Sequence, residues 1–147
     1  MTGKVFVDTN VLIYAHDLDA DPKRTVAAAI LKDLWSTRLG ILSTQVLQEF
    51  YVNVTRKIPS LLSPAVAREI VRSYCAWPVQ VLEPEMILRA SEIEERHRLS
   101  FWDALIVTAA LAGHAAKILS EDLQPGKMIE GVLIENPFAV SPASEPG

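Results

Sequence analysis

The sequence is poor in cysteine, since its 147 residues include only Cys75. A single thiol cannot form an intrachain disulfide or build a thiolate cage for a metal ion. A disulfide-stapled scaffold is therefore excluded. We expect Cys75 to be a small buried side chain in a helix, and the simplest compartment for the protein is the reducing cytoplasm.

The sequence also lacks a hydrophobic run long enough to cross a membrane. Its most apolar stretch, Ala104 to Ala112, has about half of the ~20 residues that a bilayer requires. Near the N-terminus, Asp8 and Asn10 interrupt the apolar residues that follow Lys4, which excludes the core of a signal peptide. We therefore expect no membrane partner.

A third absence is an excess of positive charge. The chain has 14 Lys and Arg against 18 Asp and Glu, a formal net charge of −4. A protein that binds nucleic acid mainly by neutralising phosphates should be basic. The acidity could instead be concentrated in one pocket, where a bound divalent metal would partly invert the local charge.

Apolar residues are abundant, at 50% of the chain, and the mean hydropathy of +0.20 is high for a small protein. The length fits one domain with a single core. We predict a domain over residues 1–140 and a disordered tail over residues 141–147, which contain Pro and Ser. Surplus apolar surface often forms a subunit interface, so we also expect an oligomer.

Short apolar runs alternate with longer stretches of helical periodicity, and Asp21 followed by Pro22 predicts one helix start, with Val26 on its inward face. Ile87 is expected to point inward from a later helix. Strands alternating with helices imply a mostly parallel sheet covered on both faces. The predicted fold class is an α/β three-layer sandwich with about five strands. The expected strands are 4–7, 41–43, 79–82, 117–120 and 132–135, and the expected helices are 11–15, 22–37, 44–56, 64–74, 83–97 and 101–112.

Four acidic residues lie near the predicted carboxyl ends of strands. Asp8 directly follows the first strand, and Asp122 comes two residues after Ser120 at the end of a later one. Asp103 is in the first turn of a helix, and Glu49 lies about a turn and a half into another. Ligands of open α/β sheets bind beyond the carboxyl ends of the strands, so all four acids can face one site.

Converging carboxylates repel one another, and their pKa values rise unless a cation compensates. Mg²⁺ and Mn²⁺ prefer oxygen ligands, usually a few carboxylates and retained waters. Such an ion can activate water and stabilise charge on a phosphodiester. The four acids therefore predict a site for one or two divalent ions.

Each acid also has a structural interpretation. Asp103 follows Ser100 at the spacing of a capping box, Asp122 lies in an ordinary turn composition, and Glu49 could be a solvated helix residue. Asp8 differs, because an acid beside the most apolar strand is costly without a partner. Only the combination of all four clearly favours function.

The segments around these acids resemble the motifs of PIN-domain nucleases. Residues 5–12 (VFVDTNVL) resemble the opening of that family, and residues 45–50 (QVLQEF), 101–106 (FWDALI) and 118–123 (ILSEDL) resemble its other three acidic motifs. They occur in the family's order and span almost the whole chain apart from the tail. The small size is similar to that of VapC-type toxins of bacterial toxin–antitoxin pairs.

The resemblance implies a PIN-like sandwich and a Mg²⁺- or Mn²⁺-dependent endoribonuclease that hydrolyses RNA phosphodiester bonds. It also implies a homodimer and a cognate antitoxin protein that silences the enzyme. The implied catalytic and metal-binding residues are Asp8, Glu49, Asp103 and Asp122, while Asn10 and Ser120 would orient carboxylates or waters.

Several neighbouring residues have two interpretations. Glu121 either joins the metal ligands or faces solvent. Lys23-Arg24 and Arg56-Lys57 either contact RNA phosphates or are ordinary solvated charges. Trp102 could stack on a base, but its place near the start of a helix that opens onto the core favours packing.

Two other functions compete with the nuclease. Asp8 could be the nucleophile of a phosphotransfer enzyme, but such enzymes need a second acid two residues later, where Asn10 stands. A non-catalytic PIN-like binding module would keep the fold and lose one or more acids, whereas all four are present. A DNA-cleaving relative is disfavoured by the small size of the chain.

Overall fold

One six-stranded sheet runs through the centre of the computed structural model, which describes residues 3–139. All neighbouring strands are parallel except the pair β5–β6. The predicted, mostly parallel sheet is confirmed. It has six strands instead of about five because the short antiparallel strand β5 was not predicted. In the order β3-β2-β1-β4-β6-β5, the strands are β3 (Val79–Gln80), β2 (Gly40–Ser43), β1 (Lys4–Val7), β4 (Ala115–Leu119), β6 (Val132–Glu135) and β5 (Met128–Ile129).

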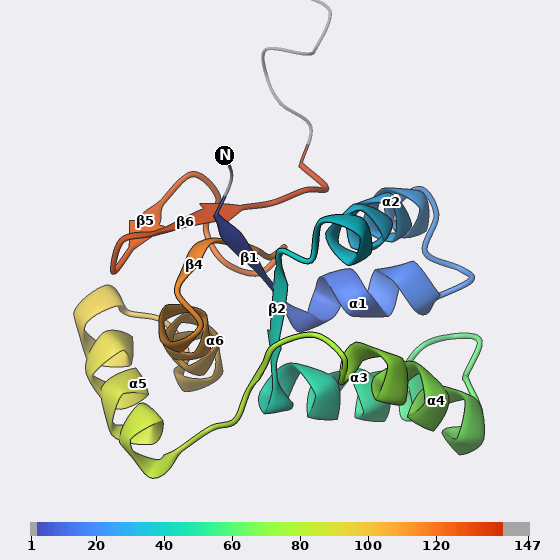
Figure 1. The fold of residues 1–147 in the computed structure, drawn as a ribbon, viewed down its shortest axis with the longest axis horizontal. Helices are drawn as coiled ribbons and strands as arrows, with labels where there is room; N and C mark the ends of the chain where they lie inside the picture. The colour runs from blue at the N-terminus through green and yellow to red at the C-terminus, as the bar shows by residue number, and fades with distance from the viewer. Residues whose placement is uncertain (1–2, 140–147) are drawn as a thin grey trace, which may run out of the picture.

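Helices cover both faces of this sheet, as predicted for a three-layer sandwich. Figure 1 shows α1 and α2 on one side of the strands and α5 and α6 on the other. Serine side chains at positions 43, 63 and 100 cap α3, α4 and α6 by accepting backbone hydrogen bonds. The helices are α1 (Thr9–His16), α2 (Lys23–Thr37), α3 (Thr44–Arg56), α4 (Pro64–Tyr74), α5 (Pro84–His97) and α6 (Phe101–Ala112). Among residues 3–139, no helix combines the length and the apolar character needed to cross a membrane.

The order of the strands places a topological switch between β1 and β4. The chain leaves β1 through α1 and α2 to reach β2 on one side, and it reaches β4 on the other side only after β3, α5 and α6. Open α/β sheets bind ligands at such a point, beyond the carboxyl ends of the two strands. The segments that follow β1 and β4 therefore meet at the position that the fold makes available to a ligand.

The start and the buried face of α2 differ from the prediction. Pro22 is the N-cap and the helix begins at Lys23, while the Asp21 carboxylate accepts a hydrogen bond from the Thr25 hydroxyl over 2.9 Å. Because the buried face follows Ala27, Leu31 and Leu34, Val26 is 37% exposed at its edge. The helical periodicity was correct, but its phase was off by one residue.

Two other predicted buried side chains are on the surface. Ile87 is 49% exposed on α5, where Ala90 and Ile93 supply the buried contacts. Cys75 is exposed, since it is the C-cap of α4 and Tyr74 is the last residue that the helix buries. In both cases the helix forms where predicted, but the apolar residue lies beside its narrow buried stripe.

An aromatic cluster of Trp35, Tyr74 and Trp77 packs at the amino end of the sheet, where β2 begins. The ring centroids of Trp35 and Trp77 are 5.3 Å apart and those of Tyr74 and Trp77 are 5.4 Å apart. Both pairs have the edge-to-face geometry that aromatic rings prefer. Gly40 makes this packing possible, because a Cβ at its position would lie 2.3 Å from the Trp77 ring. This end of the sheet is therefore an aromatic region, with a cavity of about 530 Å³ beside Trp35 and Trp77.

Candidate active site

Asp8 occupies the switch point itself. It follows β1, caps the N-terminus of α1 and is only 4% exposed. Its Oδ1 accepts a hydrogen bond from the backbone N–H of Thr9 over 2.7 Å, and its Oδ2 accepts one from the Ser120 hydroxyl over 2.7 Å. Burial raises the pKa of Asp8 to about 7, against the lowering effect of these hydrogen bonds, and the nearby charges of Asp122 and Asp103 raise it further.

Ser120 joins the segment after β4 to Asp8. The Ser120 side chain is fully buried, and its Oγ also accepts hydrogen bonds from the backbone N–H groups of Asp122 and Leu123, at 3.1 and 3.3 Å. The hydroxyl is therefore committed to donating to Asp8 while it shapes the turn that carries Asp122. The structure brings Asp8, Ser120 and Asp122 together as predicted.

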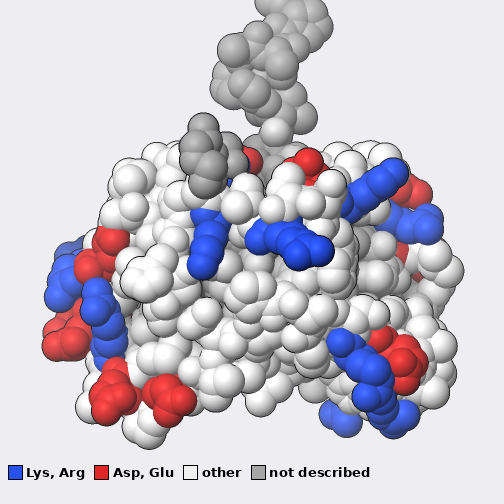
Figure 2. Space-filling model, in the orientation of Figure 1, with Lys and Arg blue, Asp and Glu red and all other residues white. Residues whose placement is uncertain are grey.

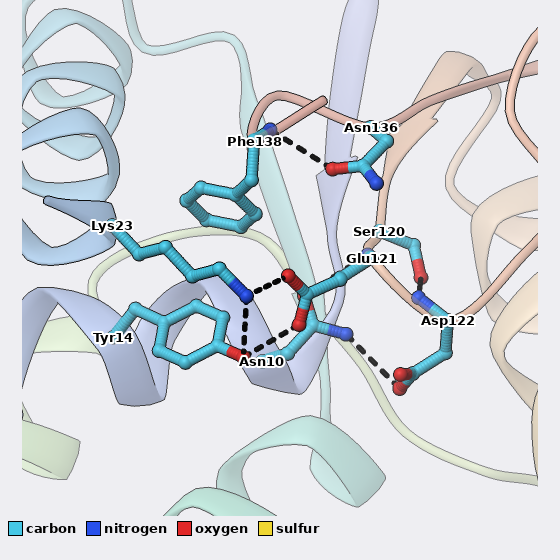
Figure 3. Close-up of polar contacts among 8 residues, drawn as sticks. All are labelled: Asn10, Tyr14, Lys23, Ser120, Glu121, Asp122, Asn136 and Phe138. Carbon is cyan, nitrogen blue, oxygen red and sulfur yellow. Dashed lines mark hydrogen bonds and ion pairs between the residues drawn. The ribbon is translucent and has the colours of Figure 1, made fainter. Parts of the chain in front are cut away.

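Asn10 fixes the same turn from α1. Its Nδ2 donates to Oδ2 of Asp122 over 3.1 Å, and its Oδ1 accepts the backbone N–H of Glu121 over 3.2 Å. Figure 3 shows the amide nitrogen of Asn10 directed at the Asp122 carboxylate. Asn10 therefore orients the Asp122 carboxylate through a direct contact.

Glu121 points away from the acids, towards α1 and α2. Figure 3 shows its carboxylate between the Tyr14 hydroxyl, which donates over 2.5 Å, and the ammonium of Lys23, with which it forms an ion pair. Lys23 Nζ also lies 4.9 Å from the centroid of the Tyr14 ring and 5.9 Å from that of Phe138. Glu121 thus neither faces Asp122 nor lies free in solvent, and the Lys23 charge is already paired.

Glu49 reaches the site from α3 and is held by two side chains. The Thr9 hydroxyl donates to its Oε1 over 2.6 Å, and Gln45 Nε2 donates to its Oε2 over 3.3 Å. The same Gln45 nitrogen also donates to the backbone carbonyl of Trp102 over 3.2 Å. Gln45 is 5% exposed, and its Oε1 is buried without a hydrogen-bond partner in the described part of the chain, which is unusual for a buried polar atom. Gln45 therefore ties Glu49 to the start of α6.

Asp103 lies in the first turn of α6, after the cap residue Ser100, whose Oγ accepts its backbone N–H over 3.1 Å. The Ser100 side chain thus caps the backbone of the helix at Asp103. The carboxylate has a second relation, because its pKa is raised by burial and then by the charges of Asp122 and Glu49, while the Ser100 hydroxyl opposes the rise. Capping and proximity to the other acids therefore coexist at Asp103.

The four acids come from four separate segments around the switch point: the ends of β1 and β4, and one helix on each face of the sheet. Among residues 3–139, no three His, Cys, Asp or Glu side chains are gathered closely enough to enclose a metal ion. Mg²⁺ commonly binds through one or two carboxylates and retains several waters. A set made only of carboxylates, in which burial and neighbouring acids raise the pKa values of Asp8 and Asp103, therefore fits Mg²⁺ or Mn²⁺ and does not fit a soft metal.

An open groove of about 490 Å³ runs beside the acids, between α1 and α3. Glu49 and Asp122 lie on its lining, as do Asn53 and Lys57 from the end of α3. Lys57 is thus positioned to meet a negatively charged group in the groove. The groove gives an extended ligand access to Glu49 and Asp122 along its length.

The prediction that Trp102 packs into the protein is wrong. Its side chain is 62% exposed, and the neighbouring Phe101 is the ring that packs against the core. The two rings meet edge to face, with centroids 5.4 Å apart. The apolar character of α6 misled the prediction, because the second residue of a helix can face away from the core that the rest of the helix contacts.

Sequence reasoning missed the hydrogen-bond partners of Glu49. The hydroxyl directly after Asp8 and the amide one helical turn before Glu49 were the available signals, since residues four apart share a helix face. The Tyr14–Lys23–Glu121 contacts carry no such local signal, because they join residues about 100 positions apart in the chain.

Fold and site together define an α/β protein with a carboxylate-rich site at the switch point of a parallel sheet. The model of the PIN domain family matches residues 5–128, and the chain belongs to this family. No curated protein is significantly similar to it in sequence.

Solved structures with the same fold include several toxin–antitoxin proteins. The VapC20 toxin of Mycobacterium tuberculosis, described as cleaving the sarcin–ricin loop, is 21% identical with a TM-score of 0.63, over 81% of this chain and 90% of that one. A toxin–antitoxin complex from Klebsiella pneumoniae is 17% identical with a TM-score of 0.67, over 93% and 100%. A DNA-bound VapBC from Salmonella typhimurium is 17% identical with a TM-score of 0.65, over 92% and 99%. At this identity the likeness concerns the fold.

Proposed function

We propose that this protein is a Mg²⁺- or Mn²⁺-dependent endoribonuclease whose active site is formed by Asp8, Glu49, Asp103 and Asp122. The observation that carries the proposal is the Asp8 carboxyl, which is buried at the switch point with a pKa of about 7 beside other acids. Such an arrangement is unfavourable unless a cation compensates for it. A fold without use for that charge would be more stable with a neutral residue there.

A bound divalent ion supplies Lewis acidity and lowers the pKa of water near the scissile phosphate. The residues that would hold it are Asp8 and Asp103, with Glu49 and Asp122 binding directly or through water. The protein's own contribution is orientation. Ser120 fixes one oxygen of Asp8, and the side chains that hold Asp122 and Glu49 are Asn10 and Thr9 respectively.

The geometry disfavours Asp8 as a phosphotransfer nucleophile. An attacking carboxylate oxygen must reach phosphorus, whereas both oxygens of Asp8 already accept hydrogen bonds and the residue is 4% exposed. A ligand role needs only a remaining lone pair on one oxygen. The residue is better placed to hold a cation than to form a covalent intermediate.

The proposed biological role is that of a toxin in a toxin–antitoxin pair, acting in the cytoplasm as a homodimer that a cognate antitoxin silences. Its support is the match in fold, over 90% or more of their lengths, to proteins described as toxins or as toxin–antitoxin complexes. The proposed nuclease domain comprises residues 1–140. An arginine of the antitoxin placed over the acids would make electrostatic sense as an inhibitor.

The test is cleavage of a mixed set of structured RNAs by purified protein with Mg²⁺, Mn²⁺ or EDTA. The matched variant is Asp8→Asn/Asp103→Asn, which keeps the size of both side chains and removes two charges. We expect cleavage by the wild type with either metal, and loss of cleavage in EDTA and in the folded variant. An Asp8→Asn/Asp103→Asn protein that cleaves as fast as the wild type would contradict the assignment of the site. A wild type that binds RNA and metal without cleaving it would instead support a non-catalytic binding module.

A further inference from the structure

The proposed active site has few positive charges with which to hold RNA. Among the residues that line its groove in the described part of the chain, Lys57 alone is basic, while Glu49 and Asp122 are acidic. The whole chain carries a formal net charge of −4. On the face shown in Figure 2, a few basic side chains lie across the upper part, and basic and acidic side chains are mixed at the left and right edges. Phosphate neutralisation, the usual source of affinity for nucleic acid, is therefore weak here.

Binding energy must then come in part from the bases. Aromatic side chains supply it in proteins that bind single strands, because every base has a face on which an indole can stack. Bases of an RNA duplex are already stacked and are not available in this way, whereas bases of loops and ends can be splayed out. An exposed aromatic ring beside the acids would thus provide affinity and select single-stranded RNA.

Trp102 has this position. It directly precedes Asp103 at the start of α6, and its indole is 62% exposed. Its backbone carbonyl and the Glu49 carboxylate accept hydrogen bonds from the same nitrogen of Gln45. The backbone of Trp102 is therefore held near two of the four acids, since Asp103 follows it in the chain and Gln45 bridges it to Glu49.

The indole is also supported by the ring of the preceding residue. Phe101 packs against the core and meets the Trp102 ring edge to face at 5.4 Å. The other exposed tryptophan, Trp35, is 41% exposed but belongs to the aromatic cluster with Tyr74 and Trp77. Trp102 is thus an exposed ring with a fixed support, which a stacking surface requires because little side-chain freedom is lost on binding.

We propose that Trp102 is a base-stacking residue that binds a splayed nucleotide of single-stranded RNA next to the acidic site. The strand then extends along the groove towards Lys57, which meets a phosphate. This inference rests on the proposed ribonuclease function and adds to it a residue that contacts the bases of the substrate.

The test measures binding in the Asp8→Asn background with Mg²⁺, which blocks hydrolysis and reduces the negative charge of the site. A short labelled RNA is presented as a single strand and, separately, annealed to its complement. We expect Trp102→Ala to weaken binding of the single strand about 10- to 100-fold. The affinity of Trp102→Phe should lie between those of Trp102→Ala and the parent, and the affinity for the duplex should not change. Trp35→Phe is the matched control and should bind like its parent.

Tryptophan fluorescence gives an independent readout. Stacking on a base should quench the emission of Trp102, so adding the single strand should lower the fluorescence of the parent and of Trp35→Phe but not of Trp102→Phe. Equal binding by Trp102→Ala and its parent would overturn the inference. An equal loss of single-strand and duplex binding would also overturn it. A change in the sedimentation mass of Trp102→Ala with RNA binding intact would show that the indole contacts another protein chain, and would overturn it too.

The same experiments separate this inference from the proposed function. A wild type that cleaves RNA and a Trp102→Ala variant that cleaves it with unchanged kcat/KM would leave the ribonuclease standing and remove Trp102 from it. A folded wild type that neither binds nor cleaves RNA would overturn both. Retained stabilisation by Mg²⁺ in Trp102→Ala is expected in either case, because the indole is not among the proposed metal ligands.

Discussion

The two ends of the central sheet have opposite character. At the amino end, Trp77 packs edge to face against Trp35 and Tyr74, and a Cβ on Gly40 would collide with the Trp77 ring. At the carboxyl end, burial raises the pKa of Asp8, and the charges of Asp122 and Asp103 raise it further. Aromatic packing stabilises the fold, whereas gathered carboxylates destabilise it in the absence of a cation.

The contrast indicates which end carries the chemistry. Folded proteins generally satisfy local rules of packing and charge, and violations concentrate where function requires them. A buried carboxyl at the switch point, Asp8, with the charges of Asp122 and Asp103 nearby is such a violation. Substitutions at the two ends should accordingly change different observables.

The largest effect on stability is expected at the amino end. Trp77 is 7% exposed, and Trp77→Ala should lower the free energy of unfolding by about 3–5 kcal/mol through lost contacts and a cavity. The cleavage rate per folded molecule should be unchanged. Chemical denaturation, with activity measured below the transition, checks both, and Trp77→Phe is a milder control. A fall in the rate per folded molecule of Trp77→Phe would show that the two ends are coupled.

The next effect concerns the pH dependence of stability at the carboxyl end. The pKa of Asp8 is about 7 in the folded protein, against an ordinary value of 3.8 for an aspartate. Between these pH values the unfolded chain loses a proton that the folded protein keeps, so stability falls as pH rises towards 7 and the cost is complete above it. Each unit of pKa difference corresponds to about 1.4 kcal/mol, which amounts to a few kcal/mol in all.

Thermal unfolding in EDTA measures this cost. Asp8→Asn lacks the titrating group. The difference between its Tm and that of the wild type should therefore increase, in favour of the variant, from pH 5 to pH 8. Added Mg²⁺ should reduce this difference by stabilising the wild type. A Tm difference that stays constant with pH would show that the Asp8 carboxyl is not held in an unfavourable state.

The smallest effect is expected at Glu121, which supports the site without belonging to it. Glu121→Gln weakens the contacts with Lys23 and Tyr14 that fix the loop before Asp122. Removing such a supporting group should reduce kcat/KM about 10-fold, with a matching loss of Mg²⁺ affinity and little change in Tm. An effect as large as that of Asp103→Asn would place Glu121 among the residues that bind the ion. Lys117→Met, which breaks an exposed ion pair with Glu135, is the control.

The sequence was sufficient to predict much of the fold. The alternation of apolar runs and helical periodicity indicated the sandwich, and the start of α6 at Phe101 followed from the serine that caps it. The short strand β5 could not be predicted, because Met128–Ile129 stand between Lys127 and Glu130, whereas the equally short β3 lies in the longer apolar run 79–82. The phase of α2 was wrong because Ala27 is buried in place of the larger Val26, and hydrophobicity favours the larger side chain.

The candidate site was predictable in its acids and much less so in their supports. Asp8 and Asp122 could be brought together because carboxyl ends of parallel strands share an edge. The exposed indole of Trp102 and the pairing of Glu121 with Lys23 depend on how side chains pack in space. Local sequence carries little information about contacts of that kind.

Direct binding of Mn²⁺, followed by calorimetry or by electron paramagnetic resonance, examines the carboxyl end without relying on any RNA. The wild type should bind the ion at neutral pH, and Asp103→Asn should bind it at least about 10-fold more weakly while remaining folded. Equal affinity of the two folded proteins, or no binding by the wild type, would contradict the assignment of these carboxylates to a divalent metal site.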